Sequence, residues 1–218
     1  IGMIERHNPV VGFARNALAE GRFGELVSLS ARRVSSMPGR IKDVGCVLDL
    51  GIHDIDVMRY LAGSPVRSVY ALSGRQGEAP FEDHADILID FENGTTGFSQ
   101  TNWLTPMKVR RLSLTCMKNF VELDYMTQGV TISSSQYVSL DQGDLFQAPL
   151  EFDIRNISLK KQEPLKNEIS DFLAAIKGGA GPLVPGAEGL ESMRVALAAI
   201  ASSAEKRKVE MKDFGGCT

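Results

Sequence analysis

The run from residue 48 to residue 56, Leu-Asp-Leu-Gly-Ile-His-Asp-Ile-Asp, carries side chains that could do chemistry at helical spacing. On a helix, Asp49, His53 and Asp56 stand at positions i, i+4 and i+7, so they share one face. A histidine within reach of a carboxylate can be held in one tautomer with a pKa near neutrality, which general acid–base catalysis requires. We therefore predict that Asp49 and His53 are catalytic and that Asp56 helps to bind the substrate.

The alternative is that Asp49 and His53 share an ordinary hydrogen bond on a solvated helix face. The density of polar groups argues for function, because residues 49–56 contain three aspartates and one histidine between strongly apolar flanks. Like charges packed this closely cost stability, which favours a functional purpose.

The surrounding pattern predicts that this stripe lies on a buried helix from Val44 to Ala62, ended by Gly63 and Pro65. An earlier helix should begin at Asn8-Pro9, after a short apolar strand, and end at Gly21. The apolar residues that bury the striped helix are Ile52, Ile55, Val57, Met58 and Leu61.

A first strand is expected at residues 25–35, before the striped helix. After that helix, short β-rich runs extend from about residue 66 to residue 160, with a hairpin turn at Glu92-Asn93-Gly94. Two helices, Pro164 to Lys177 and Ala187 to Lys206, and a short strand near Val209 close the chain. This order predicts an α+β fold: one domain spanning 1–218, with a mostly antiparallel or mixed open sheet and helices packed on one face.

The composition is that of an ordinary globular protein, with 43% hydrophobic and 23% charged residues among 218. A net charge of −3 argues against nucleic-acid binding, and no apolar run is long enough to span a membrane. Three cysteines without metal-ligand spacing fit a reducing cytoplasm. The opening Ile1-Gly2-Met3-Ile4 is typical of the middle of a protein, so we expect a fragment of a longer chain.

Two other kinds of site are not supported. The run Gly178-Gly179-Ala180-Gly181 follows a helix instead of a strand, so it is not a dinucleotide-binding turn. A metal site at His53-Asp54 would need further ligands, and only His7 and His84 remain, so we expect no metal.

Together these features resemble the second domain of the glucose-fructose oxidoreductase, inositol dehydrogenase and MocA-like (Gfo/Idh/MocA) family, over nearly the whole chain. The motifs that carry the resemblance are Arg6-His7-Asn8-Pro9, Gly21-Arg22-Phe23-Gly24, the run 48–56, Glu163-Pro164-Leu165 and Pro182-Leu183-Val184. The resemblance implies a dihydrodipicolinate-reductase-like domain that supplies the substrate pocket and the sheet used for oligomers. It also implies that NAD or NADP is bound by an N-terminal Rossmann domain, which is absent from this chain.

For the chemistry, the resemblance implies hydride transfer between a sugar-like hydroxyl carbon and nicotinamide, with Asp49 and His53 acting in proton transfer at the reacting hydroxyl. The family's catalytic lysine belongs to a Glu-Lys-Pro motif, and no such motif occurs here. The chain alone is therefore expected to be inactive.

A narrower likeness, to relatives that oxidise the 3-hydroxyl of UDP-N-acetylglucosamine, is suggested by the segments 32–34, 38–45 and 102–106. The cations that could pair with a diphosphate are Arg32, Arg33, Arg40 and Lys42. The alternative is that they form a solvated face of an edge strand. Trp103 could stack on a sugar or uracil ring, although a hairpin tryptophan is more often part of the core.

Two further functions stay open: an inositol or free-sugar dehydrogenase, and a non-catalytic sensor or interaction module of the same fold. The presence of both Asp49 and His53 favours an enzyme. The expected partners are a small sugar or UDP-sugar and further copies of the chain, as a homodimer or homotetramer formed through the sheet.

Overall fold

The computed structural model describes residues 1–218 except 40, 42, 77–79, 138–149, 179 and 216–218. The four α-helices in this part are α1 (Pro9–Ala19), α2 (Ile52–Ala62), α3 (Pro164–Ile176) and α4 (Gly186–Glu205). The strands are β1 (Leu26–Ser36), β2 (Val66–Gly74), β3 (His84–Phe91), β4 (Thr96–Asn102), β5 (Leu104–Cys116), β6 (Phe120–Asp124), β7 (Gly129–Tyr137), β8 (Leu150–Ser158) and β9 (Val209–Glu210).

The described strands form one sheet of nine strands in the order β8-β7-β6-β5-β1-β4-β3-β2-β9. Among these neighbours only β1 and β4 run parallel, with Arg33 level with Thr101, and the other pairs are antiparallel. The predicted α+β class with a mixed open sheet is confirmed. The first strand lies in the middle of the sheet, however, so the cations on it do not belong to an edge strand.

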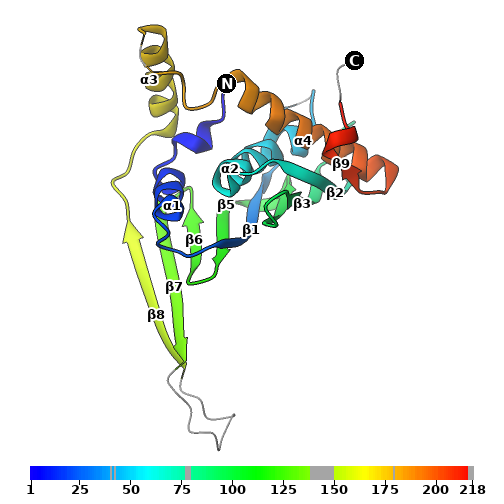
Figure 1. The fold of residues 1–218 in the computed structure, drawn as a ribbon. Helices are drawn as coiled ribbons and strands as arrows, with labels where there is room; N and C mark the ends of the chain where they lie inside the picture. The colour runs from blue at the N-terminus through cyan, green and yellow to red at the C-terminus, as the bar shows by residue number, and fades with distance from the viewer. Residues whose placement is uncertain (40, 42, 77–79, 138–149, 179, 216–218) are drawn as a thin grey trace, which may run out of the picture.

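Helices α1, α2 and α4 cover one face of the sheet (Figure 1). The core lies between these layers, where every second residue of a strand points at the helices. Ile87 and Ile89 of β3 and Ile55 and Met58 of α2 are almost completely buried there. The opposite face of the sheet carries exposed side chains such as Leu88.

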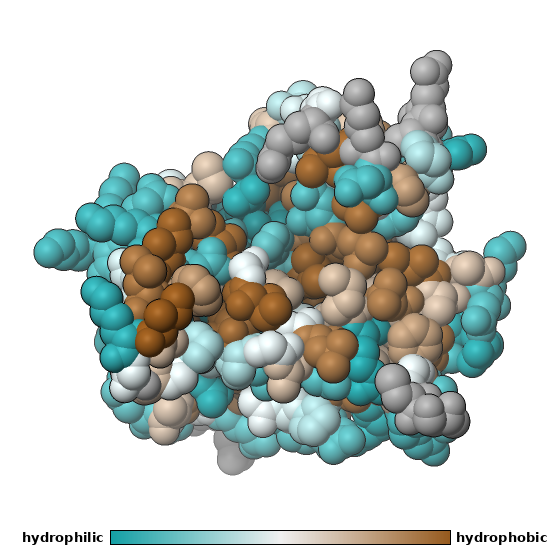
Figure 2. All heavy atoms as spheres, turned by 90° about the horizontal axis from the view of Figure 1, so that it is seen from above, coloured by the Kyte–Doolittle hydropathy of each residue, from teal (hydrophilic) through white to brown (hydrophobic). Residues whose placement is uncertain are grey.

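Helix α3 stands apart from the three packed helices, at the top left of Figure 1. Its thirteen residues include no buried side chain. Its exposed apolar residues, which belong to the hydrophobic area on the left of Figure 2, are Leu165, Ile169, Phe172, Leu173 and Ile176. An amphipathic helix whose apolar face is exposed to solvent is typical of an interaction surface.

The segment before the first helix differs from the prediction, because Ile4–His7 forms a 3-10 helix and not a strand. Asn8 then caps α1 as expected, since its side-chain oxygen accepts from the backbone N–H of Val10 and Pro9 occupies the first turn.

Helix α4 covers the part of the β2 edge that β9 leaves unpaired. β9 pairs with β2 only at Ser68 and Val69. Further along the same edge, the backbone N–H groups of Ala71 and Ser73 donate to the hydroxyls of Ser202 and Ser203, at 3.0 and 2.8 Å. Within the residues described, no helix is long and apolar enough to cross a membrane.

Candidate active site

The helix that carries the predicted catalytic pair is built in two parts. Residues Val47–Gly51 form a π-helical segment, and α2 continues from Ile52. The side chain of Glu82 accepts from the backbone N–H of Val47 at 3.1 Å, which satisfies one of the free donors at the helix start. Gly45 makes this approach possible, because a Cβ there would stand 2.0 Å from the Glu82 carboxylate.

His53 lies in the first turn of α2 and is mostly buried. Burial and the positive charges of Arg33 and Arg110 together lower the pKa of its imidazole to about 4, although the negative charge of Glu5 opposes them. The Nδ1 atom is buried without a hydrogen-bond partner. His53 is therefore neutral at pH 7, and the carboxylate that acts on its pKa is Glu5 and not the predicted Asp49.

Asp49 lies one turn earlier, in the π-helical segment, and is partly exposed. Its backbone N–H donates to the carbonyl oxygen of Gly45 at 3.1 Å, and no hydrogen bond joins its carboxylate to His53. The two side chains belong to one helix surface, but the predicted direct contact is not made in this structure.

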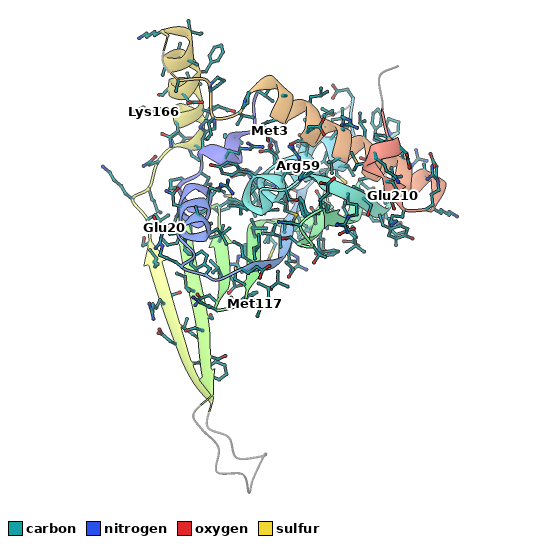
Figure 3. All side chains as sticks on the ribbon, in the orientation of Figure 1. Met3, Glu20, Arg59, Met117, Lys166 and Glu210 are labelled. Carbon is teal, nitrogen blue, oxygen red and sulfur yellow. The ribbon has the colours of Figure 1, made fainter. Side chains whose placement is uncertain are left out.

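Asp56 does not share that surface. It is fully buried, and its carboxylate accepts two hydrogen bonds of 2.7 Å from Arg6 and one of 2.8 Å from Ser192 of α4. Arg59, labelled in Figure 3, also reaches across to α4 and donates to Ser192. The predicted binding role is therefore corrected: Asp56 holds α2 to the chain start and to α4.

Arg33 points from β1 toward His53 and is 2% exposed. Its guanidinium donates to Glu5 at 2.8 Å and to Asp54 at 2.9 Å, and it lies 5.3 Å from the centroid of the Tyr125 ring. Burial alone would raise the pKa of Glu5, but Arg33 and Arg110 outweigh it and lower that pKa. The charge of Arg33 is thus neutralised inside the protein.

The predicted cluster of cations for a diphosphate does not assemble among the described residues. Arg32 is next to Arg33 on a strand, so it points to the opposite face, where it donates to Gln100 at 2.8 Å. Arg33 is buried and paired, as described above. Arg40 and Lys42 lie outside the described residues.

Trp103 is 3% exposed, and its Nε1 is buried without a partner. No face of the indole ring is open for stacking on a ligand. The alternative weighed for this residue, a position in the core, agrees with its burial.

Two cations on β5 were missed in the sequence. Arg110 is level with Arg33 of β1, and it lies 3.5 Å from the carboxylate of Glu5. Lys108 lies two residues earlier, where the register between β1 and β5 shifts, and is exposed. The only signal in the sequence is the pair Arg110-Arg111, which mirrors Arg32-Arg33, but the pairing of their strands could not be foreseen.

The described residues show neither of two other kinds of site. No group of three or more histidine, cysteine, aspartate or glutamate side chains is placed to hold a metal ion in this part of the chain. The parallel pair β1 and β4 is connected through α2, β2 and β3, so these strands do not form the simple β-α-β unit with a glycine-rich turn that seats a dinucleotide.

Residues 12–122 match the family described as the GFO/IDH/MocA C-terminal domain. An inositol 2-dehydrogenase from Rhizobium meliloti is 28% identical over 97% of this chain and 64% of its own length. A UDP-N-acetylglucosamine 3-dehydrogenase from Acidithiobacillus ferrooxidans is 26% identical over 90% of this chain and 59% of its own length. The chain thus spans less than two thirds of either relative, and inositol dehydrogenases are the most frequent among its named relatives.

Solved structures share the fold. The crystal structure of an oxidoreductase domain protein from Kribbella flavida superposes with a TM-score of 0.80 at 18% identity, and covers 97% of this chain and 65% of that one. A levoglucosan dehydrogenase in complex with NADH and levoglucosan has a TM-score of 0.77 at 16% identity, with the chains covered to 97% and 65%.

Proposed function

This chain belongs to the Gfo/Idh/MocA family of NAD(P)-dependent dehydrogenases, and we propose that it is the substrate-binding and acid–base half of an enzyme that oxidises a hydroxyl of a sugar or polyol. The observation that carries the proposal is His53, a mostly buried and neutral imidazole one turn from Asp49. A neutral histidine can accept the proton of a hydroxyl, which the family's reaction requires.

In the proposed reaction a C–OH group becomes a carbonyl. The hydroxyl proton goes to His53, and the hydrogen on carbon leaves with its electron pair as hydride. Since Nδ1 of His53 is buried, Nε2 is the nitrogen that meets the substrate. Asp49 stabilises the imidazolium that forms, through its negative charge on the same helix surface. A nicotinamide, when bound, supplies the acceptor for the hydride.

We propose that NAD or NADP is held by a Rossmann domain that precedes this chain. Three observations support this proposal. The relatives are longer than the chain, the described residues contain no dinucleotide turn of their own, and α3 exposes an apolar stripe from Leu165 to Ile176. On this proposal residues 1–218 act as one unit for substrate binding and subunit pairing.

For the substrate, a free inositol or sugar has better support than the UDP-N-acetylglucosamine that the sequence motifs favour. Most named relatives are inositol dehydrogenases. In addition, Arg33 is neutralised by Glu5 and Asp54, and Arg32 points to the opposite face of the sheet. UDP-N-acetylglucosamine stays the second candidate because a dehydrogenase for it is 26% identical over 90% of the chain.

We further propose that two copies pair through the open face of the sheet, since no helix covers it among the described residues and it exposes apolar side chains. Those on β2 and β3 are Tyr70, Leu72 and Leu88. A reducing, cytoplasmic location is also proposed, supported by Cys46 and Cys116, which are free thiols in the interior.

The test of the proposed reaction is turnover of the complete protein with NAD+ or NADP+ and myo-inositol, glucose or UDP-N-acetylglucosamine. His53→Ala should lower kcat about 100-fold or more, with a smaller change in KM, because a positioned base acts in the transition state. His84→Ala is the matched control and should keep wild-type turnover, since His84 is paired with Asp83 at 2.8 Å on β3. Equal rates for His53→Ala and the wild type would exclude this role of His53.

A further inference from the structure

Two cations on β5, Arg110 and Lys108, lie near Arg33 and Glu5. Arg110 is level with Arg33 across the β1–β5 pair, and its side chain is 29% exposed. Lys108 lies two residues earlier, where the register between β1 and β5 shifts, and is exposed. Arg110 faces the same side of the sheet as Arg33, and both cations can be reached from solvent.

Glu5 and Asp54 bind Arg33 at 2.8 and 2.9 Å, so Arg110 shares Glu5, at 3.5 Å. The negative charge of Asp49 also acts on Arg110. No ion pair of Lys108 is found in the described part of the chain. Arg110 lowers the pKa of the Lys108 ammonium, as expected for two like charges held close together. Two like charges held close together destabilise the folded protein unless an anion binds to them.

We propose that Lys108 and Arg110 bind an anionic group of the substrate, a carboxylate or a phosphate, while the reacting hydroxyl meets His53. The inference rests on the proposed function for the identity of the reacting hydroxyl. It favours an acidic sugar or polyol over the neutral inositol that most named relatives oxidise. A guanidinium offers a planar fork of donors to such a group, and the ammonium adds a point charge.

Arg110 and His53 act on one another electrostatically. The positive charge of Arg110 lowers the pKa of the His53 imidazole. An anion bound there would offset the charge of Arg110 and so raise the pKa of His53, which would make it a stronger base.

The first test uses binding to the 218-residue chain, with D-gluconate, D-glucose 6-phosphate and the neutral D-glucitol as probes. We expect calorimetric titration to show binding of at least one anion and weaker or no binding of glucitol. The comparison of the two anions tells a carboxylate site from a phosphate site. NMR titration of the imidazole signals, with His53→Gln to assign them, should show that the bound anion raises the pKa of His53.

The second test compares variants. Lys108→Met should weaken binding of the anion about tenfold, as expected for losing one charged hydrogen bond. Lys118→Met removes one positive charge at the other end of β5 and should leave binding unchanged. The proposal is overturned if neither anion binds, if glucitol binds as tightly, or if the Lys118 and Lys108 variants weaken binding equally.

Turnover of the complete protein separates this inference from the proposed function. If the anions bind at Lys108 but no sugar or polyol is oxidised, the proposed function fails and the anion site stands. If neutral polyols are oxidised with a higher kcat/KM than their acidic counterparts, the proposed function stands and the anion site is refuted.

Discussion

Arg6 and Asp56 are fifty residues apart and meet inside the protein, where two hydrogen bonds of 2.7 Å join the guanidinium to the carboxylate. Their side chains are 3% and 1% exposed. The pair ties the segment before α1 to the helix that carries His53. A disturbance of this pair is therefore expected to reach the candidate active site through the backbone of α2.

Arg6→Met should destabilise the chain by about 3 kcal/mol, because it leaves the Asp56 carboxylate buried without its cation. Urea unfolding of the 218-residue chain measures this loss. Arg22→Met is the control, since Arg22 pairs with Glu20 on the surface, and it should cost less than about 1 kcal/mol. A similar loss for both variants would show that the buried pair contributes no more than a surface pair.

His53 should make the folded chain sensitive to acid. Its pKa falls from 6.5 to about 4 on folding, since it is buried and near Arg33 and Arg110, with Glu5 opposing them. Between these two values the unfolded chain binds the extra proton, so stability falls as the pH is lowered through this window, by up to about 1.4 kcal/mol per pH unit.

The measurement is urea unfolding from pH 7 to pH 4 for the wild type and for His53→Gln, which has no titrating ring. As the pH is lowered through this window, the wild type should lose stability relative to the glutamine variant. His84→Gln serves as the control and should follow the wild type. A constant difference between His53→Gln and the wild type would mean that the imidazole titrates alike in both states.

The open face of the sheet should hold two copies together. Leu88 is 53% exposed on this face, and Leu88→Lys should shift the protein from dimer or tetramer to monomer, because a charge would be buried at the contact. Leu197→Lys on α4, where the residue is 42% exposed, is the matched control and should keep the oligomer. Sedimentation equilibrium at micromolar concentration is the measurement, and a monomeric wild type would contradict the proposal.

NADH should not bind tightly to the chain by itself. The described residues provide no glycine-rich turn between a strand and a helix for the pyrophosphate. Calorimetric titration of the 218-residue chain with NADH should show no sub-millimolar binding. An affinity below this limit would reveal a nucleotide site within these residues and would remove the need for a preceding Rossmann domain.

The sequence predicted the elements well because their signals are local. The caps at Asn8-Pro9 and Gly63 and the turn at Asn93-Gly94 lie where expected, and the expected strands from β2 to β8 all occur. The core of α2 also follows from its spacing, since Ile55, Val57 and Met58 are fully buried.

The site was harder to predict because its members meet through long-range pairing. The partner of Asp56 is Arg6, and Arg110 becomes a neighbour of Arg33 only when β5 pairs with β1. Helical spacing also could not show that a π-helical segment precedes His53, nor that Asp56 points toward α4. The spacing of residues in the sequence shows which side chains share a face of one helix or strand. It does not show which helices and strands lie next to one another, and the site depends on that.

The serine hydroxyls on α4 protect one edge of the sheet against aggregation. A sheet edge with free N–H groups is a template on which another chain can add a strand. Beyond the two residues paired with β9, the donors of Ala71 and Ser73 are occupied by Ser202 and Ser203. This edge is therefore closed to a further strand without the proline or lysine that often protects such edges.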